Sequence, residues 1–241
     1  MGFGGFVSSI GSALSSAASS VCSAIGSACS TIGGALFAGA SGIGALATGI
    51  VGSIVAISLP EILIAIQVIG AIISVIAEAL GLKNKEEKPE ELGMKAEEAE
   101  KKPEDFESTE AYIEYLRKEV EIDKEKLNNL KDEDKIKYAA IGSSLYIKAI
   151  EEKYDMKMPA EFWTTVADLK MDGKQVKEYI DSFKKHSIED MGDMTGYIKN
   201  DLQDGKDKGK ISEAMIDALK EINPESTEND LYDKLNNLKV E

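Results

Sequence analysis

The 241-residue chain carries 43 acidic and 28 basic residues, which gives a net charge of −15. An acidic surface is repelled by phosphate backbones and by anionic lipid headgroups, so this charge argues against nucleic-acid binding and against electrostatic attraction to membranes. No residue from Met1 to Pro60 is charged, and only Glu61 and Glu78 are charged before Lys83. The composition therefore predicts an apolar region, residues 1–82, followed by an acidic, water-soluble one.

Residues 7–36 combine an apolar stripe with a stripe of hydroxyl groups at helical spacing, which predicts a small-residue amphipathic helix with an uncharged polar face. A flexible Gly/Ser/Ala tract is the alternative for this segment. The apolar stripe includes Val7, Ile10, Leu14, Val21, Ile25 and Leu36. The candidate pore-lining residues are Ser8, Ser12, Ser15, Ser19, Ser23 and Ser30.

Glycines recur through the same region and continue beyond it. Small residues let helix backbones approach closely in lipid, so these positions predict helix packing between copies of the chain, in the manner of a glycine zipper. The packing candidates are Gly26, Gly39, Gly42, Gly49 and Gly52. We therefore expect a homo-oligomer.

Two apolar runs, residues 34–59 and 62–82, meet at Pro60 and Glu61. Each run reaches the roughly 20 residues that a helix needs to cross the bilayer core, and proline suits the first turn of a new helix. The pattern predicts a transmembrane-type helical hairpin, with a single bent helix as the alternative. The expected membrane-inserting residues of the two runs are Ile54, Leu59, Ile62, Ala65, Ile69, Ile73 and Ile76.

The carboxyl groups of Glu61 and Glu78 are candidate pH-sensitive groups. If Glu61 crosses a bilayer at the hairpin tip, it crosses at lowest cost when protonated, so insertion should strengthen at acid pH. Glu78 lies near the other end of the second run, where a side chain that reaches back to the membrane surface is the simpler interpretation.

The acidic region begins with residues 83–107, which contain Pro89 and Pro103 and lack a sustained apolar stripe. We expect a charged linker or a short exposed helix there. Residues 108–241 show helical spacing of apolar side chains and no convincing alternation, which predicts a small all-α domain. Its expected helices begin at Ser108 or Thr109, run from 133 to 154, open at Pro159, and cover 176–183, 188–202, 211–222 and 231–238.

The chain lacks the sequence motifs of metalloproteases, serine hydrolases and P-loop nucleotide-binding proteins, and it has no Cys/His cluster with metal spacing. We expect no catalytic residues, no cofactor and no metal, and therefore no enzyme. Its first six residues also lack the positive charge that opens a secretory signal.

These features favour a membrane-penetrating or pore-forming protein that inserts its glycine-rich hairpin into a target or host membrane and oligomerises. A phage or virus particle, or a secretion-type injection machine, would suit its delivery. The first alternative is a membrane-anchored adaptor whose acidic helical domain recruits a protein partner. The second is an internal structural subunit of a large assembly, with its apolar third buried in protein.

Overall fold

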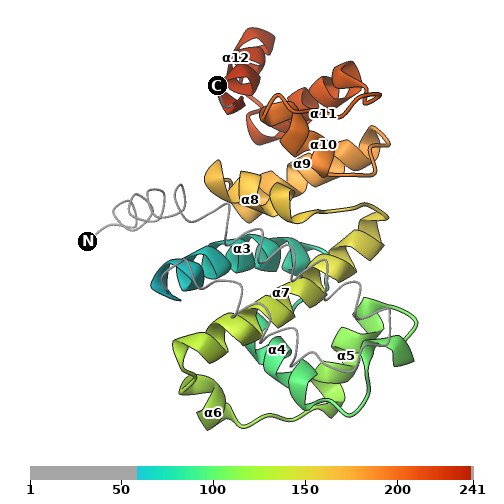
Figure 1. Ribbon diagram of the computed structural model, residues 1–241. Coiled ribbons are helices and arrows are strands. Elements are labelled where there is room, and N and C mark those ends of the chain that lie inside the picture. Colours follow the sequence, from blue (N-terminus) through green and yellow to red (C-terminus); the bar gives the residue numbers. More distant parts are fainter. Residues whose placement is uncertain (1–58, 240–241) are drawn as a thin grey trace.

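The computed structural model describes residues 59–239, with the side chains of 59–62, 64, 65, 160 and 164 excepted. This part of the chain is all helical, as predicted, and besides helices it contains an isolated parallel bridge between Lys157 and Asp190 (Figure 1). The helices are α3 (Leu59–Ala79), α4 (Pro89–Glu98), the 3-10 turn η1 (Pro103–Asp105), α5 (Thr109–Glu119), α6 (Lys124–Asn128), α7 (Asp132–Tyr154), α8 (Ala160–Asp168), α9 (Gly173–Lys185), α10 (Gly192–Ile198), α11 (Lys208–Ile222) and α12 (Glu228–Leu238).

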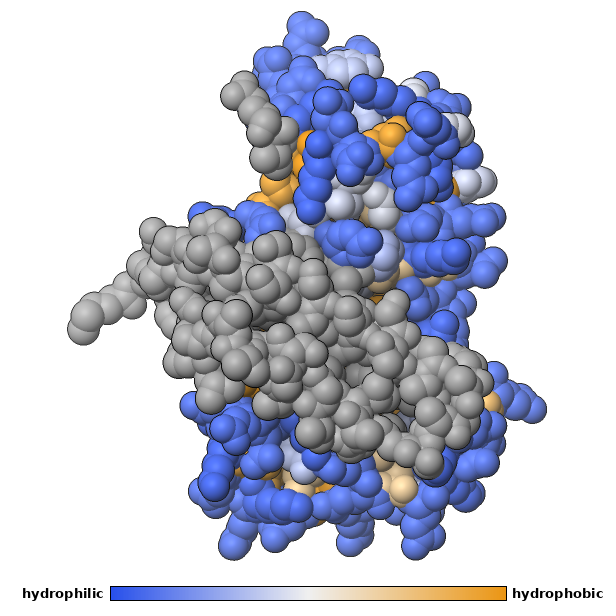
Figure 2. Space-filling view, viewed as in Figure 1, coloured by the Kyte–Doolittle hydropathy of each residue, from blue (hydrophilic) through white to orange (hydrophobic). Residues whose placement is uncertain are grey.

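Helix α3 lies in the centre of this part of the chain. Figure 1 shows it between a group formed by α4 to α7 and a second group formed by α8 to α12. It packs against α7 of the first group and against α8 and α9 of the second. Most of the described helices share a continuous apolar core that runs through α3, so α3 joins the two groups, whereas Leu127 of α6 packs in a second, smaller cluster with Met94 and Tyr138. Figure 2 shows that the surfaces of both groups are largely hydrophilic.

Residues 83–107 differ from the expected linker. Within them α4 buries Leu92, Gly93 and Met94. A Cβ at Gly93 would lie 2.0 Å from the carbonyl oxygen of Tyr138 on α7. In turn, a Cβ at Gly142 of α7 would lie 1.9 Å from the carbonyl oxygen of Pro89. Because two glycines let the backbones touch, α4 is a core helix despite its weak apolar stripe.

The helix that we expected to begin at Ser108 or Thr109 is divided into α5 and α6. Ser108 caps α5 as predicted, since its hydroxyl accepts a hydrogen bond from Ala111 N. The chain becomes extended at Val120, and Asp123 then caps α6. The break falls between the apolar positions Val120 and Leu127, where an uninterrupted helix would place the charged Asp123 or Lys124 on the same face as Val120.

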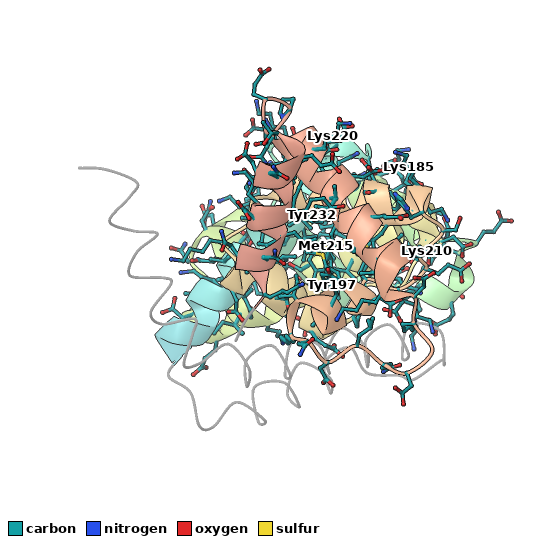
Figure 3. The ribbon with its side chains drawn as sticks, turned by 90° about the horizontal axis from the view of Figure 1, so that it is seen from above. Lys185, Tyr197, Lys210, Met215, Lys220 and Tyr232 are labelled. Carbon is teal, nitrogen blue, oxygen red and sulfur yellow. The ribbon has the colours of Figure 1, made fainter. Side chains whose placement is uncertain are left out.

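The later helices confirm the expected elements, with differences of a few residues at their ends. Helix α7 matches the predicted 133–154, and Pro159 precedes α8. Asp172 forms a capping box with Gln175 at the start of α9, and Thr227 caps α12. Figure 3 shows α11 beside α12, with the buried Met215 between them and Lys185, Lys210 and Lys220 toward the outside.

Candidate functional site

The predicted second arm of the hairpin is a core helix of the folded domain. Ile69, Ile73 and Ile76, which we expected to face lipid, are each 3% exposed or less and contact other described helices. The opposite face of α3 carries Gln67, Ala71, Val75 and Glu78, which are exposed. None of the helices in the described part of the chain is both long enough and apolar enough to cross a bilayer.

Glycines bring α3 close to both of its neighbours. A Cβ at Gly70 would lie 3.4 Å from the Ser143 hydroxyl oxygen of α7. On the other side, a Cβ at Gly173 of α9 would lie 2.7 Å from the carbonyl oxygen of Ile72. Helix α3 therefore packs closely against α7 on one side and α9 on the other. The domain boundary that we predicted at residue 82 does not separate α3 from the helices that follow it.

The C-terminal end of α3 closes with a Schellman motif. Gly81 has a φ of 73°, its N–H donates to Glu78 O at 3.1 Å, and Leu82 N–H donates to Ala77 O at 2.8 Å. Glycine is favoured at this left-handed position because it has no side chain to clash. Leu82 is 1% exposed, so the residue that follows the turn anchors it in the core.

Two cations of the acidic domain bind the carbonyl groups at this end. Lys153 Nζ donates to Leu80 O at 3.1 Å, and Arg117 Nη2 donates to Leu82 O. Arg117 also pairs with Glu87 at 2.8 Å, and both side chains are largely buried. Positive charge at a helix C-terminus is favourable because it complements the helix dipole.

The charges around this end support one another. Burial acts to lower the pKa of Arg117, but the Glu87 carboxylate and the hydrogen bonds to Glu87 and Glu114 outweigh it and raise that pKa. Hydrogen bonds from Lys118 and Arg117 hold the pKa of Glu114 below its usual value. We call Arg117, Lys153 and Glu87 the α3 clamp. Sequence reasoning missed the clamp, and its only signal was that Arg117 is the sole arginine of the chain.

Most of the predicted membrane-site residues lie outside the described residues. This holds for the apolar and serine stripes of 7–36, for the five packing glycines, for Ile54, and for the side chains of Leu59, Glu61, Ile62 and Ala65. Among the remaining candidates, Glu78 is exposed on the last turn of α3, whereas Ile69, Ile73 and Ile76 are buried.

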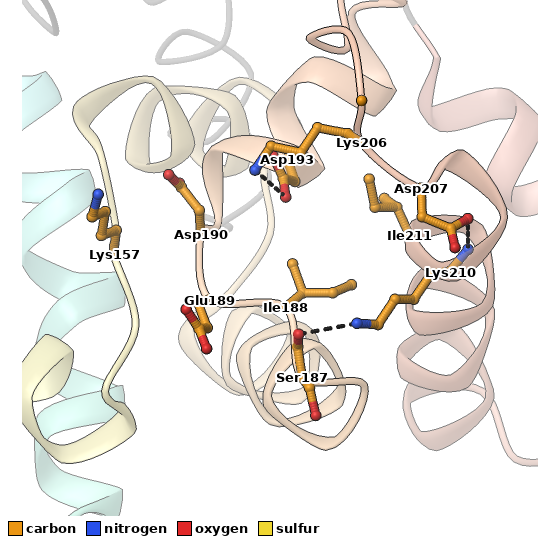
Figure 4. Close-up of a pocket in the computed structure, with 11 residues that line it drawn as sticks. Lys157, Ser187, Ile188, Glu189, Asp190, Asp193, Lys206, Asp207, Lys210 and Ile211 are labelled. Atoms are coloured by element: carbon orange, nitrogen blue, oxygen red, sulfur yellow. Dashed lines mark hydrogen bonds and ion pairs between the residues drawn. The ribbon is translucent and has the colours of Figure 1, made fainter.

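A second feature is a pair of adjoining cavities between the loops that flank α8, α10 and α11. One has a volume of about 490 Å³ and is lined by Lys157, Glu189, Asp207 and Lys210, among others (Figure 4). The other, of about 360 Å³, is lined by residues that include Glu161, Thr195 and Lys199. Asp190, Asp193 and Lys206 line both cavities, so the two form one groove.

The backbone around the groove is fixed by hydrogen bonds. Lys157 N–H donates to Glu189 O at 2.8 Å, and Met191 N–H donates to Lys157 O at 2.9 Å, which forms the isolated bridge. Asp190 Oδ1 accepts from Gly192 N–H at 2.8 Å. Lys206 pairs with Asp193 at 2.9 Å, and the hydrogen bond to Asp193 raises the pKa of Lys206. The groove is thus a defined surface with carboxylates of both loops at its walls.

A third cavity, of about 290 Å³, lies beside the groove and contains Glu151. Burial raises the pKa of Glu151, although Met158 N–H donates to its carboxylate at 2.7 Å and opposes the shift. The contact fixes the loop between α7 and α8. In the described part of the chain, no group of three or more His, Cys, Asp or Glu side chains is arranged to hold a metal ion.

No protein-family model, curated protein or solved structure matches this chain.

Proposed function

We propose that this protein is a membrane-penetrating protein that inserts the charge-free residues upstream of α3 and oligomerises through their glycines. The helical domain, with α3 in place, remains in water as carrier and docking module. The observation that carries the proposal is that the 58 residues upstream of α3 carry no charge, while the apolar face of α3 itself is already buried in the domain.

The packing of α3 separates this proposal from insertion of the whole predicted hairpin. Burying one isoleucine side chain stabilises a fold by about 1.5–3 kcal/mol. Ile66, Ile69, Ile72, Ile73 and Ile76 are all buried on α3. Withdrawing α3 would expose its partner surfaces on α7 and α9 at a cost on the order of 10 kcal/mol, which is comparable to the whole stability of a typical domain. Insertion that ends before α3 avoids this cost.

The upstream residues are sufficient for such a role. Residues 34–58 are uncharged and exceed the roughly 20 residues needed for one helical span. Residues 7–36 would then supply an additional apolar face and a hydroxyl face, which suits assembly around a narrow water-filled path. Delivery by a particle or an injection machine remains part of the proposal, because it would keep this segment from water before it meets a membrane.

The membrane-anchored adaptor is the second candidate. It is favoured because one possible membrane-spanning segment, residues 34–58, is followed at once by the folded domain, and an anchored adaptor needs only these two parts. The third candidate, a subunit of a large assembly, would place the same residues inside protein.

Dye release from liposomes, with flotation of the same samples, distinguishes the three. We expect the full-length protein both to float with liposomes and to release dye. Flotation without release would identify an anchor. A protein that neither floats nor releases dye would belong to the assembly candidate.

A crosslink tests whether α3 stays in the domain. In a Cys22→Ser, Cys29→Ser background, Gly70→Cys and Ser143→Cys would place two thiols across the α3–α7 contact. A Cβ at Gly70 would lie 3.4 Å from the Ser143 Oγ, where the sulfur of the Ser143→Cys variant would lie, so the two sulfurs are close enough to form a disulfide. We expect equal dye release from the oxidised and reduced forms. Release by the reduced form alone would show that α3 leaves the domain and that the whole hairpin inserts. The single Gly70→Cys variant controls for oxidation.

A further inference from the structure

One face of α3 is uncharged and is not covered by another described helix. We call it the outer face, and its exposed residues are Gln67, Ala71 and Val75. Val75 is one of two large apolar side chains that are exposed in the described part of the chain, whose surface is otherwise largely hydrophilic (Figure 2). A helix at the surface of a soluble domain normally presents charged side chains to water, so this face is suited to a partner.

The described neighbours of α3 leave the outer face open because they pack on its other sides. Helices α7 and α9 contact α3 through its buried isoleucines. The three outer-face residues follow one another at every fourth position, which places them on one line along the helix. Glu78 brings the first charge on this line, in the last turn of α3. The outer face is therefore an open, uncharged strip with α7 on one side and α9 on the other.

The chain itself contains a segment that matches this strip. Residues 34–58 are uncharged and end where α3 begins, at Leu59. They exceed the 21 residues of α3, so as a helix they can run back along its whole length. Figure 1 shows the first turn of α3 at the left edge of the described fold. Because no linker separates the segment from α3, its docking is intramolecular, and consecutive helices are usually neighbours in space.

Pro60 favours a reversal of the chain just before α3. It lies in the first turn of α3, and a proline ring clashes with the carbonyl group four residues earlier, so an upstream helix cannot continue through it in a straight line. Counted equally from a turn at residues 59 and 60, Ala71 lies opposite Thr48 and Gly49, and Gln67 lies opposite Gly52. Small residues on both helices allow the two axes to approach closely.

We propose that in water residues 34–58 form a helix that packs antiparallel on the outer face of α3, and that this contact opens before the segment enters a membrane. The contact removes apolar surface of both helices from water without displacing α3 from the core. The glycines that would join copies of the chain in a membrane are then first used within one chain. The opening step rests on the proposed function, whereas the contact itself does not.

Disulfide formation in the full-length protein, without lipid and in a Cys22→Ser, Cys29→Ser background, tests the contact. Ala71→Cys is combined in turn with Thr48→Cys, Gly49→Cys or Gly52→Cys, which covers one helical turn of possible register. We expect mild oxidation to give a monomer without free thiols in at least one of the three proteins, measured by thiol titration after unfolding and by a non-reducing gel.

Gly49→Cys with Asn229→Cys is the matched control. Asn229 is exposed on α12, whose main neighbour is α11. Both thiols of this protein should remain free in the monomer. As a second measurement, the single Ala71→Cys variant should react with a water-soluble maleimide at least about tenfold more slowly than the single Asn229→Cys variant, because the docked segment covers residue 71.

Liposomes test the opening step. The oxidised form of the pair that crosslinks should release little dye, because the segment cannot leave α3, and reduction should restore release. Equal release by the oxidised and reduced forms would overturn the opening step.

Three results would overturn the contact: no monomeric disulfide in any of the three pairs, equally fast labelling of Ala71→Cys and Asn229→Cys, or a disulfide-linked dimer of the single Ala71→Cys variant. The dimer would show that a second copy of α3 covers the outer face. The two proposals fail separately. A crosslink without dye release by the reduced protein would leave the contact and remove the membrane function, whereas dye release without a crosslink would do the reverse.

Discussion

Arg117 is the residue in which several parts of the fold meet. Its guanidinium binds the carbonyl of Leu82 after α3, the carboxylate of Glu87 before α4, and Glu114 on its own helix. Its side chain is 13% exposed and that of Glu87 is 8% exposed. A buried pair of this kind holds the fold in one arrangement, because either charge is costly to bury without the other.

Replacing Arg117 should therefore be costly. Arg117→Met would leave the Glu87 carboxylate buried without its cation and should lower the free energy of unfolding by about 3–5 kcal/mol. Adding Glu87→Gln should recover part of that loss. Urea unfolding followed by circular dichroism measures both effects.

Lys118→Ala is the control for this pair, because Lys118 also pairs with Glu114 but is 69% exposed. It should change stability by about 1 kcal/mol or less. Equal losses for the Arg117 and Lys118 variants would contradict the role of a buried clamp at the end of α3.

Asp217 gives the domain a pH-dependent contact. Hydrogen bonds from Lys185 and from His186, at 2.9 and 3.0 Å, hold the pKa of Asp217 below its usual value of 3.8. The unfolded chain then binds the proton more readily than the folded one, so this contribution is complete above pH 3.8 and is lost as the pH falls through the folded pKa. The contact joins α9 to α11.

Asp217→Asn should lower the melting temperature at pH 6, and the difference from wild type should shrink as the pH falls below 3.8. Thermal melts at pH 6, 4 and 2.5 measure this. Asp233→Asn, an exposed carboxylate on α12, is the matched change of charge. A difference for Asp217→Asn that stays constant from pH 6 to 2.5 would rule out this linkage.

Among the elements, α4 shows how close backbone contact can replace an apolar stripe. Half of its residues are charged, and four of them, Gly93 included, are buried because Gly93 and Gly142 let α4 and α7 touch. Helix packing normally leaves 8–10 Å between axes, and glycine at the crossing point allows the shorter limit.

Gly142→Ala should separate these helices. The new Cβ would lie 1.9 Å from Pro89 O, an atom of the backbone, so α4 must move. We expect a loss of about 3 kcal/mol or more in the free energy of unfolding, measured in urea, because overpacking in cores costs 1–3 kcal/mol and occasionally more.

Gly209→Ala is the matched control on an exposed first turn of α11, where a Cβ would lie 3.3 Å from Asp207 Oδ1. Alanine is favoured over glycine in helices by up to about 1 kcal/mol, so this variant should be neutral or stabilising. A Gly142→Ala protein as stable as Gly209→Ala would show that the two helices do not touch as described.

For the whole molecule, the proposed function assigns membrane insertion to the residues upstream of α3 and docking to the helical domain. The region contains no charge, so a single added lysine distinguishes the apolar face predicted for residues 7–36 from the serine face. A lysine on a helix face in lipid costs about 2.5–3.5 kcal/mol at the bilayer centre, whereas one on a water-filled path costs little.

Ile25→Lys should therefore abolish dye release, whereas Ser23→Lys should retain it and shift the released ions toward anions. Both variants add one positive charge to the same predicted helix, so each serves as the control for the other. Planar-bilayer conductance in a salt gradient measures the shift. Equal loss in both variants would argue against a serine-lined path.

The sequence alone determined the all-helical class, most helices from α7 to α12, and the cap at Ser108. These features are local: they follow from apolar spacing and from side chains that bond neighbouring N–H groups. The same pattern leaves the environment of an apolar helix undecided, because a surface that is apolar all round suits lipid and a protein core equally.

Only the tertiary structure decided that residues 66–77 pack in a core, because this depends on partners distant in sequence. Gly70 meets Ser143, Gly173 meets Ile72, and Arg117 and Lys153 bind the end of α3. The same holds for α4, since no local pattern records which backbones will touch. The sequence alone did determine that no residue before α3 is charged, the feature on which the proposed function rests, because charge depends on composition and not on the fold.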